Sequence, residues 1–393
     1  MQLRTALPAA VLLGGLLGGV VANFAPEARP AIRAAARPVA LIAVAEAAPA
    51  ALAWDEPAAR YERVQEFVDL FHQKQQDRMA LYLKRSGRYE GMIREKLRAR
   101  GMPEDLLYLT MIESGFNPNA RSKAQAVGLW QFIQETGERY GLRVDRYVDE
   151  RRDPERSTDA ALRYLADLYA RFGSWNLAAA AYNTGENRVG RIMRQVTGSE
   201  KGDEGAFWRI RSLLPRETRD YVPLIVAAAL VGKQPEKYGL DGVERWLPVE
   251  TQAVEVPGGT DLGAVARAVG LGEKEIRTLN PQLVRGVTPP GETYPVRVPV
   301  ERAADFQANF ERARAEHLRL AKLEAEQARA EAKLAAAKPA KAKASARAHR
   351  VRRGESLWTI SRRYDVSMAA LQRANGLSRR STLQPGQKLR IPG

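Results

Sequence analysis

Apolar residues recur at intervals of three and four over residues 61–232, the spacing that is typical of amphipathic helices. Val64, Phe67, Val68 and Phe71 show this spacing clearly. Proline with acidic residues marks helix starts, as at Pro103, and glycine marks helix ends, as at Gly115. The pattern predicts a compact all-α region.

The pattern changes near Leu247, where alternating apolar and polar residues predict a strand over 249–256. Two short helices and a closing strand are predicted to follow, at 262–269, 274–279 and 296–299. The last 45 residues show the same order, with strands at 350–352 and 389–392 and helices at 356–364 and 367–374. We interpret 249–300 and 349–393 as two copies of a βααβ unit, of which the first is degenerate.

Between these units, residues 301–337 consist almost wholly of Ala, Glu, Lys, Arg and Leu, which predicts a long exposed helix. Residues 338–353 carry seven basic and no acidic side chains and are interpreted as a basic linker. The predicted fold class is therefore mainly α, with small α+β modules.

Composition excludes several kinds of chemistry. The 393 residues carry a net charge of +16, contain no cysteine and contain three scattered histidines. Disulfides, thiolate metal sites and thiol nucleophiles are excluded, and neither a metal nor a cofactor is predicted. The positive charge raises the alternative of a nucleic-acid binder, but the basic excess is concentrated after Lys338, and no nucleic-acid partner is predicted.

The first 25 residues predict export. Arg4 is the only charge before Glu27, and a glycine-rich apolar run ends in small residues at Val20–Ala22. Removal as a signal peptide and retention as a membrane anchor over residues 5–25 remain two alternatives. Residues 26–60 are rich in Ala and Pro and are interpreted as a tether.

One carboxylate is out of place. On a helix that ends at Gly115, Glu113 shares an otherwise apolar face with Leu106, Leu109 and Thr110. Burial and the helix dipole both favour the protonated form, which is what a general acid needs. The alternative is a helix-end glutamate that is paired with an arginine such as Arg121.

The loop that follows Glu113 has the composition of a sugar-binding surface. Residues 114–134, here called the amide-rich loop, hold no acidic side chain but several amides, hydroxyls and aromatic rings. Amides bind sugar hydroxyls and N-acetyl groups, and aromatic rings stack on sugar faces. Trp130 and Phe132 have the alternative role of core residues.

Three ordered strings carry a family resemblance: ESGFNPNARSKAQAVGLWQFIQETG (113–137), AAYNTGENRV (180–189) and LPRETRDYVPLI (214–225). They resemble the successive motifs of lytic transglycosylases with a lysozyme-like fold, and GLWQF resembles the membrane-bound lytic murein transglycosylase D branch. Residues 349–393 resemble LysM, a small peptidoglycan-binding module. Ordered motifs of this length are far more specific than one short pattern.

The resemblance implies a role for each matching residue. Glu113 corresponds to the catalytic acid and base, Ser122 to a serine that contacts the N-acetyl or lactyl region, and Gln131 to a glutamine that lines the cleft. Tyr182 and Asn183 match the Ala-Tyr-Asn motif, and Tyr221 matches a tyrosine that hydrogen-bonds the catalytic carboxylate. Tyr182 and Tyr221 could instead be core rings, Asn183 could be a helix cap, and Arg219 is expected to be structural.

In the LysM-like unit, the two turns are expected to form a shallow groove for N-acetylglucosamine. The expected groove residues are Gly354, Ser356, Leu357, Asn375 and Gly376. The first copy lacks the motif that opens LysM, which puts its glycan binding in doubt, and the missing lipobox cysteine predicts that the chain is not a lipoprotein.

The expected reaction is cleavage of the bond between N-acetylmuramic acid and N-acetylglucosamine with one glutamate and formation of 1,6-anhydromuramic acid. Ordinary glycosidases use two carboxylates, and Asp149, Glu150 and Glu186 are the distant alternatives. A goose-type-like hydrolytic lysozyme and a non-catalytic peptidoglycan-binding scaffold are the competing functions.

We predict that the protein is exported to the periplasm or cell envelope and that its partner is the glycan strands of peptidoglycan. Membrane association through the N-terminus is an alternative. The predicted parts of the chain are a leader or anchor (1–25), the tether (26–60), a helical extension (61–98), a lysozyme-like domain (99–232), the degenerate module (249–300), a charged helix with the basic linker (301–348) and the LysM domain (349–393).

Overall fold

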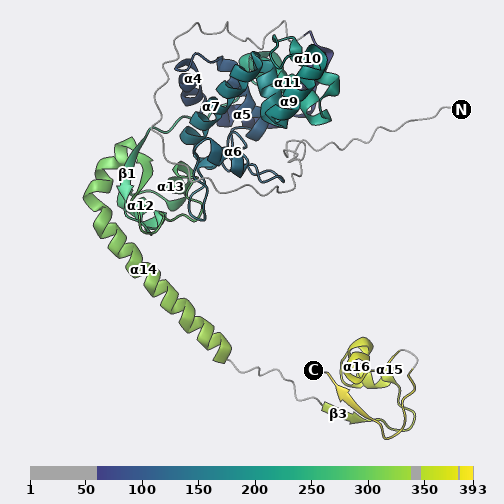
Figure 1. The fold of residues 1–393 in the computed structure, drawn as a ribbon. Coiled ribbons are helices and arrows are strands. Elements are labelled where there is room, and N and C mark those ends of the chain that lie inside the picture. Colours follow the sequence, from purple (N-terminus) through teal and green to yellow (C-terminus); the bar gives the residue numbers. More distant parts are fainter. Residues whose placement is uncertain (1–59, 338–346, 379–380, 393) are drawn as a thin grey trace, which may run out of the picture. The chain divides into compact units, whose positions relative to one another are not determined.

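The computed structural model describes residues 60–337, 347–378 and 381–392. The predicted leader, almost all of the predicted tether and residues 338–346 of the basic linker lie outside these residues. Within the described residues the chain is mainly helical and forms two small antiparallel sheets, so the predicted fold class is confirmed (Figure 1). The chain divides into two compact units between Ala315 and Glu316.

The first unit begins with a helical region. Its α-helices are α2 (Glu62–Asp69), α3 (Gln76–Ser86), α4 (Glu90–Arg98), α5 (Leu107–Ser114), α6 (Gln134–Arg139), α7 (Pro154–Phe172), α8 (Trp175–Thr184), α9 (Glu186–Thr197), α10 (Ala206–Ile210) and α11 (Arg216–Lys233). Short 3₁₀ or π turns join them at Leu70–Lys74, Glu104–Leu106, Glu150–Arg152, Arg211–Leu213 and Pro235–Tyr238.

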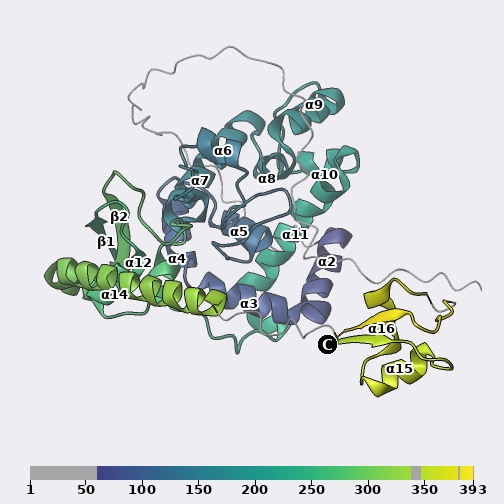
Figure 2. The ribbon, with the colours of Figure 1, turned by 90° about the horizontal axis from the view of Figure 1, so that it is seen from below.

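Helix α5 lies in the middle of this region (Figure 2) and packs against α4 and α11. Every residue from Leu107 to Ile112 is buried, so only the last turn of the helix reaches solvent. Helix α11 is equally buried from Tyr221 to Gly232. The apolar core therefore fixes the two helices on which the candidate catalytic residues lie.

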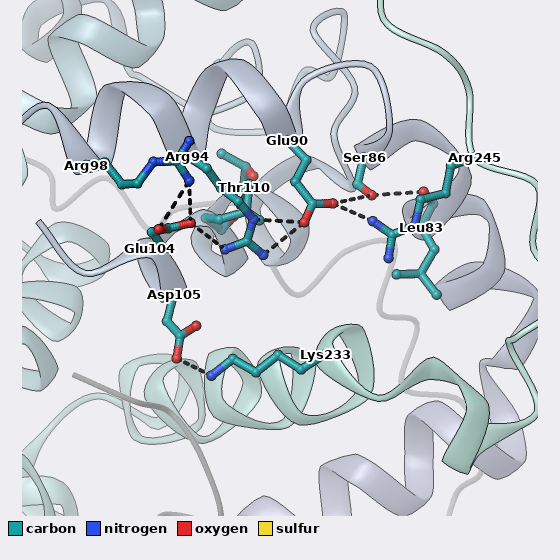
Figure 3. Close-up of polar contacts among 11 residues, drawn as sticks. Leu83, Ser86, Glu90, Arg94, Arg98, Glu104, Asp105, Thr110, Lys233 and Arg245 are labelled. Carbon is teal, nitrogen blue, oxygen red and sulfur yellow. Dashed lines mark hydrogen bonds and ion pairs between the residues drawn. The ribbon is translucent and has the colours of Figure 1, made fainter. Parts of the chain in front are cut away.

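A network of ion pairs holds the start of α5 (Figure 3). Arg94 donates to Glu90 at 2.9 Å and to Glu104 at 3.3 Å, and Arg245 donates to the other oxygen of Glu90 at 2.5 Å. Lys233, at the end of α11, donates to Asp105 just before α5. The network joins α4, α5 and α11 at the end of α5 that is opposite Glu113.

Helix α11 continues through a proline. Pro223 has no N–H for the carbonyl of Arg219, which lies four residues earlier. The Nε atom of Arg211 donates to that carbonyl at 2.8 Å and replaces the missing bond. Arg219 itself donates through Nε to the carbonyl of Leu214 at 2.7 Å, in agreement with its predicted structural role.

The first βααβ unit consists of β1 (Thr251–Val256), α12 (Leu262–Val269), α13 (Glu273–Leu279) and β2 (Tyr294–Pro299). The strands pair antiparallel, with Val254 opposite Val296. Helix α14 (Ala303–Ala337) follows a short turn at Val300–Arg302. The composition of this segment predicts a helix that is exposed along its whole length. That prediction is wrong for its first turns, because Phe306 and Phe310 pack into the core of this unit. We call residues 250–315 the first module.

The second βααβ unit, the terminal module, consists of β3 (Arg347–Arg350), α15 (Leu357–Arg363), α16 (Met368–Asn375) and β4 (Lys388–Ile391). Its strands pair antiparallel, with His349 opposite Leu389. Its buried core is small and consists of Val351, Ile360, Leu371, Leu389 and Ile391. The predicted internal repeat is thus present as two units with the same order of elements.

One asparagine holds each module in the same way. Asn280 donates to the carbonyls of Ile276 and Arg297 and accepts from the backbone N–H of Arg297, at 2.8 to 2.9 Å. Asn375 makes the same three bonds to Leu371 and Arg390, at 2.6 to 2.8 Å. Each asparagine ties the second helix to the closing strand.

Candidate active site

Glu113 lies in the last turn of α5, next to an abrupt reversal of the chain. Gly115 ends the helix with a φ of +55°, and Phe116 follows with a φ of +56°. A Cβ atom on Gly115 would lie 2.0 Å from the ring of Tyr82, so both the backbone conformation and the space require glycine. The reversal turns the amide-rich loop back over the end of α5.

The carboxyl group of Glu113 is held by one tyrosine. The hydroxyl of Tyr221, from α11, donates to Oε1 of Glu113 at 2.5 Å. Burial raises the pKa of Glu113 to about 7, although the bond from Tyr221 lowers it and the charge of Glu217 raises it further. Near neutral pH, Glu113 therefore holds its proton in a large fraction of molecules, as a general acid must.

Glu217 is a second carboxylate near Glu113, which the sequence reasoning did not identify. Burial raises its pKa, while a hydrogen bond from Asn183 lowers it. Glu217 lies four residues before Tyr221 on α11, so both side chains are on one face of that helix. This spacing was the available signal, because it places Glu217 on the face that approaches Glu113.

Tyr182 and Asn183 lie in the last turn of α8, where Tyr182 is near Glu113 and Asn183 is hydrogen-bonded to Glu217. The hydroxyl of Tyr182 donates to the carbonyl of Trp130 at 2.7 Å, and burial with the nearby charge of Glu113 raises its pKa well above its ordinary value. The side-chain oxygen of Asn183 accepts from Thr218 at 2.8 Å. The helix is capped by Gly185, so Asn183 is not its cap.

The amide-rich loop is held by its own polar groups. Ser114 donates to the carbonyl of Leu129 at 2.9 Å, Ser122 accepts from the N–H of Ala126 at 3.0 Å, and Gln131 donates to the carbonyl of Gly128 at 2.9 Å. Trp130 is fully buried and Phe132 nearly so, which assigns both rings to the core.

The structure thus brings Glu113, Tyr221, Tyr182 and, through Glu217, Asn183 into one site. Gln131 follows Trp130, whose carbonyl Tyr182 contacts. Ser122 lies in a turn of the same loop and forms hydrogen bonds with Gln125 and Ala126.

The alternative partners of Glu113 are engaged elsewhere. Arg121 donates to Gln125, and not to Glu113. Asp149 pairs with Arg151, Glu150 accepts from the N–H of Arg143, and Glu186 pairs with Arg139. Among the residues that the structure describes, no group of three histidine or acidic side chains is arranged to hold a metal ion.

The expected groove residues of the terminal module lie at two turns. Gly354 and Ser356 are exposed just before α15, where Ser356 caps the helix by accepting from the N–H of Thr359 at 3.2 Å, and Leu357 is half-buried. Gly376 is exposed after α16, where Asn375 forms the bonds described above. Both turns present backbone to solvent.

Comparisons with known proteins identify the domains of the chain. Residues 91–204 match the transglycosylase SLT domain, residues 250–315 match the LysM-like domain of lytic transglycosylase MltD, and residues 349–392 match the LysM domain. The resemblance inferred from the motifs is therefore confirmed: the chain carries an SLT domain and LysM-type domains.

Among curated proteins, membrane-bound lytic murein transglycosylase D from Escherichia coli K12 is 34% identical over 311 residues, which are 77% of this chain and 63% of that protein. The chain thus spans less than two thirds of the length of this relative. The peptidoglycan transglycosylase gp16 of Escherichia phage T7 is 36% identical over 38% of this chain and 11% of its own length. A solved structure of an inactive variant of the lytic transglycosylase Slt from Pseudomonas aeruginosa is 24% identical, with a TM-score of 0.31, over 40% of this chain and 26% of that chain.

Proposed function

We propose that this chain is a lytic transglycosylase that cleaves the β-1,4 bond between N-acetylmuramic acid and N-acetylglucosamine in peptidoglycan. The observation that carries the proposal is the half-buried Glu113, whose pKa is raised to about 7 and which is aligned by Tyr221. The names of the relatives and the matched SLT domain support the same activity.

In the proposed reaction, protonated Glu113 gives its proton to the glycosidic oxygen, and the bond from that oxygen to C1 of the muramic acid breaks. The positive charge that develops at C1 is stabilised by the substrate's own N-acetyl group. The Glu113 carboxylate then takes the proton of the 6-hydroxyl, whose oxygen bonds to C1. The products are a free 4-hydroxyl and a 1,6-anhydromuramic end, without consumption of water.

The raised pKa supports the use of one group for both steps. A carboxyl with a pKa near the working pH gives up and recovers a proton at similar cost. Glu217 contributes to that value through its charge and needs no proton-transfer role of its own. Tyr221 keeps the carboxyl oriented while its charge changes.

Ser122, Gln131, Tyr182 and Asn183 are proposed to bind the sugar chain beside Glu113. In each of them one polar group holds neighbouring protein atoms, which fixes the side chain before substrate arrives. The groove residues of the terminal module are proposed to bind N-acetylglucosamine through the exposed turns at Gly354 and Gly376.

We also propose that the protein works in the cell envelope after export, with the domain boundaries given by the sequence. The relative from Escherichia coli is named as membrane-bound. Within the described residues, no helix is long and apolar enough to cross a membrane. The predicted leader or anchor over residues 1–25 lies outside those residues.

Mass spectrometry of the fragments that the purified protein releases from peptidoglycan tests the reaction. We expect muropeptides that end in 1,6-anhydromuramic acid. Reducing ends would instead assign the hydrolytic lysozyme reaction, and the absence of released fragments from an active-site-intact protein would favour the non-catalytic scaffold.

A further inference from the structure

Arg151 is not among the residues proposed to act on substrate, but its side chain forms hydrogen bonds with the backbone of the amide-rich loop. Its side chain is buried, with 8% of its surface exposed. The Nη1 atom donates to two backbone carbonyls of the loop, those of Gln125 at 3.2 Å and Phe132 at 3.1 Å. The guanidinium thus joins two points of the loop that are seven residues apart in the sequence.

The orientation of Arg151 is set by Asp149. The Nε and Nη2 atoms of Arg151 donate to the two carboxylate oxygens of Asp149, both at 2.8 Å. This bidentate pair fixes the plane of the guanidinium and leaves Nη1 aimed at the loop carbonyls. Lysine has a single ammonium group and cannot reproduce this fork.

The backbone of the same segment also limits the loop. Gly128 has a φ of +91°, and a Cβ atom there would lie 1.7 Å from the carbonyl oxygen of Arg151. The loop therefore lies directly against the Arg151 backbone, with no space for a side chain between them. A displacement of residue 151 would displace the loop with it.

The segment before Arg151 is in turn part of the first module. Val148 is fully buried and belongs to the apolar core of that module. The N–H of Asp149 donates to the carbonyl of Gln282 at 2.9 Å, and the N–H of Val284 donates to the carbonyl of Tyr147 at 3.0 Å. Residues 147–149 thus lie against the second turn of the module, after Asn280.

An ion pair with a buried aspartate adds a second connection. Arg297 of β2 donates to both oxygens of Asp153 at 2.8 and 3.0 Å. Asp153 is the N-cap of α7, where it accepts from the N–H groups of Glu155 and Arg156. Residues 147–153 are therefore fixed to the module at both ends.

We propose that Arg151 is a positioning residue for substrate binding, and that the first module acts on the active site by holding the segment 147–153 on which Arg151 lies. The module is thus a brace for the amide-rich loop. This inference rests on the proposed function, because it concerns the loop that would bind the sugar chain. Arg151 touches the loop backbone and acts on substrate only through it.

The test uses the full chain with Arg151→Lys, which removes the fork, and Arg297→Gln, which breaks the connection to the module. Arg302→Gln is the matched control, because Arg302 lies in the same module and pairs with Asp305 on its exposed side. Kinetics on soluble glycan strands should show KM raised about tenfold for Arg151→Lys, as expected for lost charge-assisted bonds, and raised less for Arg297→Gln. The pH above which activity falls should stay unchanged, because Glu113 is not touched.

A second measurement does not depend on activity. The amides of Val127 and Gly128 donate within the loop, to the carbonyls of Phe132 and Ala120. Their hydrogen exchange should become faster in Arg151→Lys and Arg297→Gln and stay unchanged in Arg302→Gln. The effects of the two variants should be less than additive when combined, because both act through one segment.

The outcomes separate this inference from the proposed function. The proposal that the first module supports the loop would be refuted if Arg297→Gln leaves both KM and amide hydrogen exchange unchanged, at a temperature where circular dichroism shows a folded protein. If Arg151→Lys does not fold, Arg297→Gln and Arg285→Ala decide the matter, because Arg285 is exposed and connects the module to the segment by donating to the carbonyl of Arg146 at 2.8 Å and lying over the ring of Tyr147. A wild-type protein that cleaves no glycan would refute the proposed function, while the exchange data would still test the brace.

Discussion

The two βααβ modules share a frame but differ in what their second turn contacts. In both, an asparagine ties the second helix to the closing strand with the same three hydrogen bonds. In the first module, the residues after that asparagine, Pro281 to Leu283, are buried, and Gln282 and Val284 form backbone hydrogen bonds with Asp149 and Tyr147. In the terminal module, the corresponding Gly376 is exposed.

The first turns differ in the same direction. In the first module, the segment that follows the second turn contacts the first turn. The N–H of Leu262, where α12 begins, donates to the carbonyl of Gly286 in that segment at 2.8 Å. In the terminal module, Gly354 and Ser356 are exposed, and the turn is held from inside by Glu355, which accepts from the N–H of Arg352 at 2.8 Å. One frame thus presents its turns to protein in one copy and to solvent in the other.

This difference suggests a division of labour in which the first module supports catalysis and the terminal module supports attachment to the wall. The largest test is Glu113→Gln, which removes the one group that both gives and takes a proton in the proposed reaction. Turnover should fall by about 10³-fold or more, whereas sedimentation of the protein with peptidoglycan should be unchanged. Substantial remaining lysis would refute the assignment of Glu113.

Deletion of residues 338–393 should give the reverse result. Cleavage of short soluble glycans should be unchanged, because the amide-rich loop and its brace lie in the first unit. Action on intact sacculi should weaken by about 10²-fold, since the terminal module raises the local concentration of the enzyme at the wall. Equal loss on both substrates would show that the terminal module takes part in catalysis.

The binding test can distinguish sugar recognition from charge. Attraction between exposed charges is strongly screened at 1 M salt, where the screening length is about 3 Å. Binding of the terminal module to peptidoglycan should survive this salt and be competed by chitin oligomers. Loss in salt without competition would assign the module an electrostatic role.

The two units should also respond to pH in opposite directions. Burial raises the pKa of Glu113 to about 7, so the first unit loses stability as the pH rises from about 4.5 through 7. In the terminal module, the backbone N–H of Arg352 and the side chain of His349 lower the pKa of Glu355, so that stability is present above the ordinary glutamate pKa and lost as the pH falls below it.

Thermal unfolding at pH 5 and pH 8 measures this contrast. Glu113→Gln should stabilise the first unit by about 3 kcal/mol at pH 8 and by much less at pH 5, because only the ionised carboxylate is disfavoured by burial. The transition of the terminal module should be the same in wild type and variant. A gain that does not depend on pH would mean that burial does not govern the pKa of Glu113.

The asparagines offer a matched pair of substitutions. Asn280→Ala and Asn375→Ala each remove three hydrogen bonds and should destabilise their own module by about 2 kcal/mol. Asn280→Ala should also raise KM on soluble glycans, because Asn280 holds the backbone of Arg297, which pairs with Asp153. Asn375→Ala should weaken only wall binding. The same kinetic effect from both variants would argue against the division of labour.

The sequence predicted the order of the elements in both modules and the placement of Glu113 at a helix end, because periodicity, helix caps and an isolated carboxylate on an apolar face are local features. The first strand of the terminal module was misplaced, since β3 covers Arg347–Arg350 and not 350–352. It could not predict the contact of Gln282 with Asp149, since backbone hydrogen bonds between distant segments have no residue signature. Phe306 and Phe310 are an apolar pair four residues apart in a charged segment, a spacing that indicates one buried helix face. The overall composition of the helix, which predicts exposure, obscured this signal.

The candidate site shows the same limit. Glu113 and Tyr221 are 108 residues apart in the sequence, so only the motif resemblance linked them. The proximity of Glu217 to Glu113 follows from the sequence only once Tyr221 is linked to Glu113, because Glu217 lies four residues before Tyr221 on α11. Asn183 could be placed on α8 from the sequence, but its contact with Thr218 required the tertiary structure.

The smallest expected effect concerns the bond between Tyr221 and Glu113, and it tests whether the catalytic unit is tuned independently of the terminal module. Tyr221→Phe removes one hydrogen bond and should raise the barrier to reaction by about 1 kcal/mol, or somewhat more because the bond is charge-assisted in the ionised state. The bond lowers the pKa of Glu113, so its loss should raise that pKa and shift the alkaline limit of activity upward. Turnover on soluble glycans, measured across pH, should therefore fall near neutrality while the descending limb moves to higher pH. Wall binding should not change, because the groove turns at Gly354 and Gly376 belong to the other unit. An unchanged rate and pH profile would return Tyr221 to the role of a core ring.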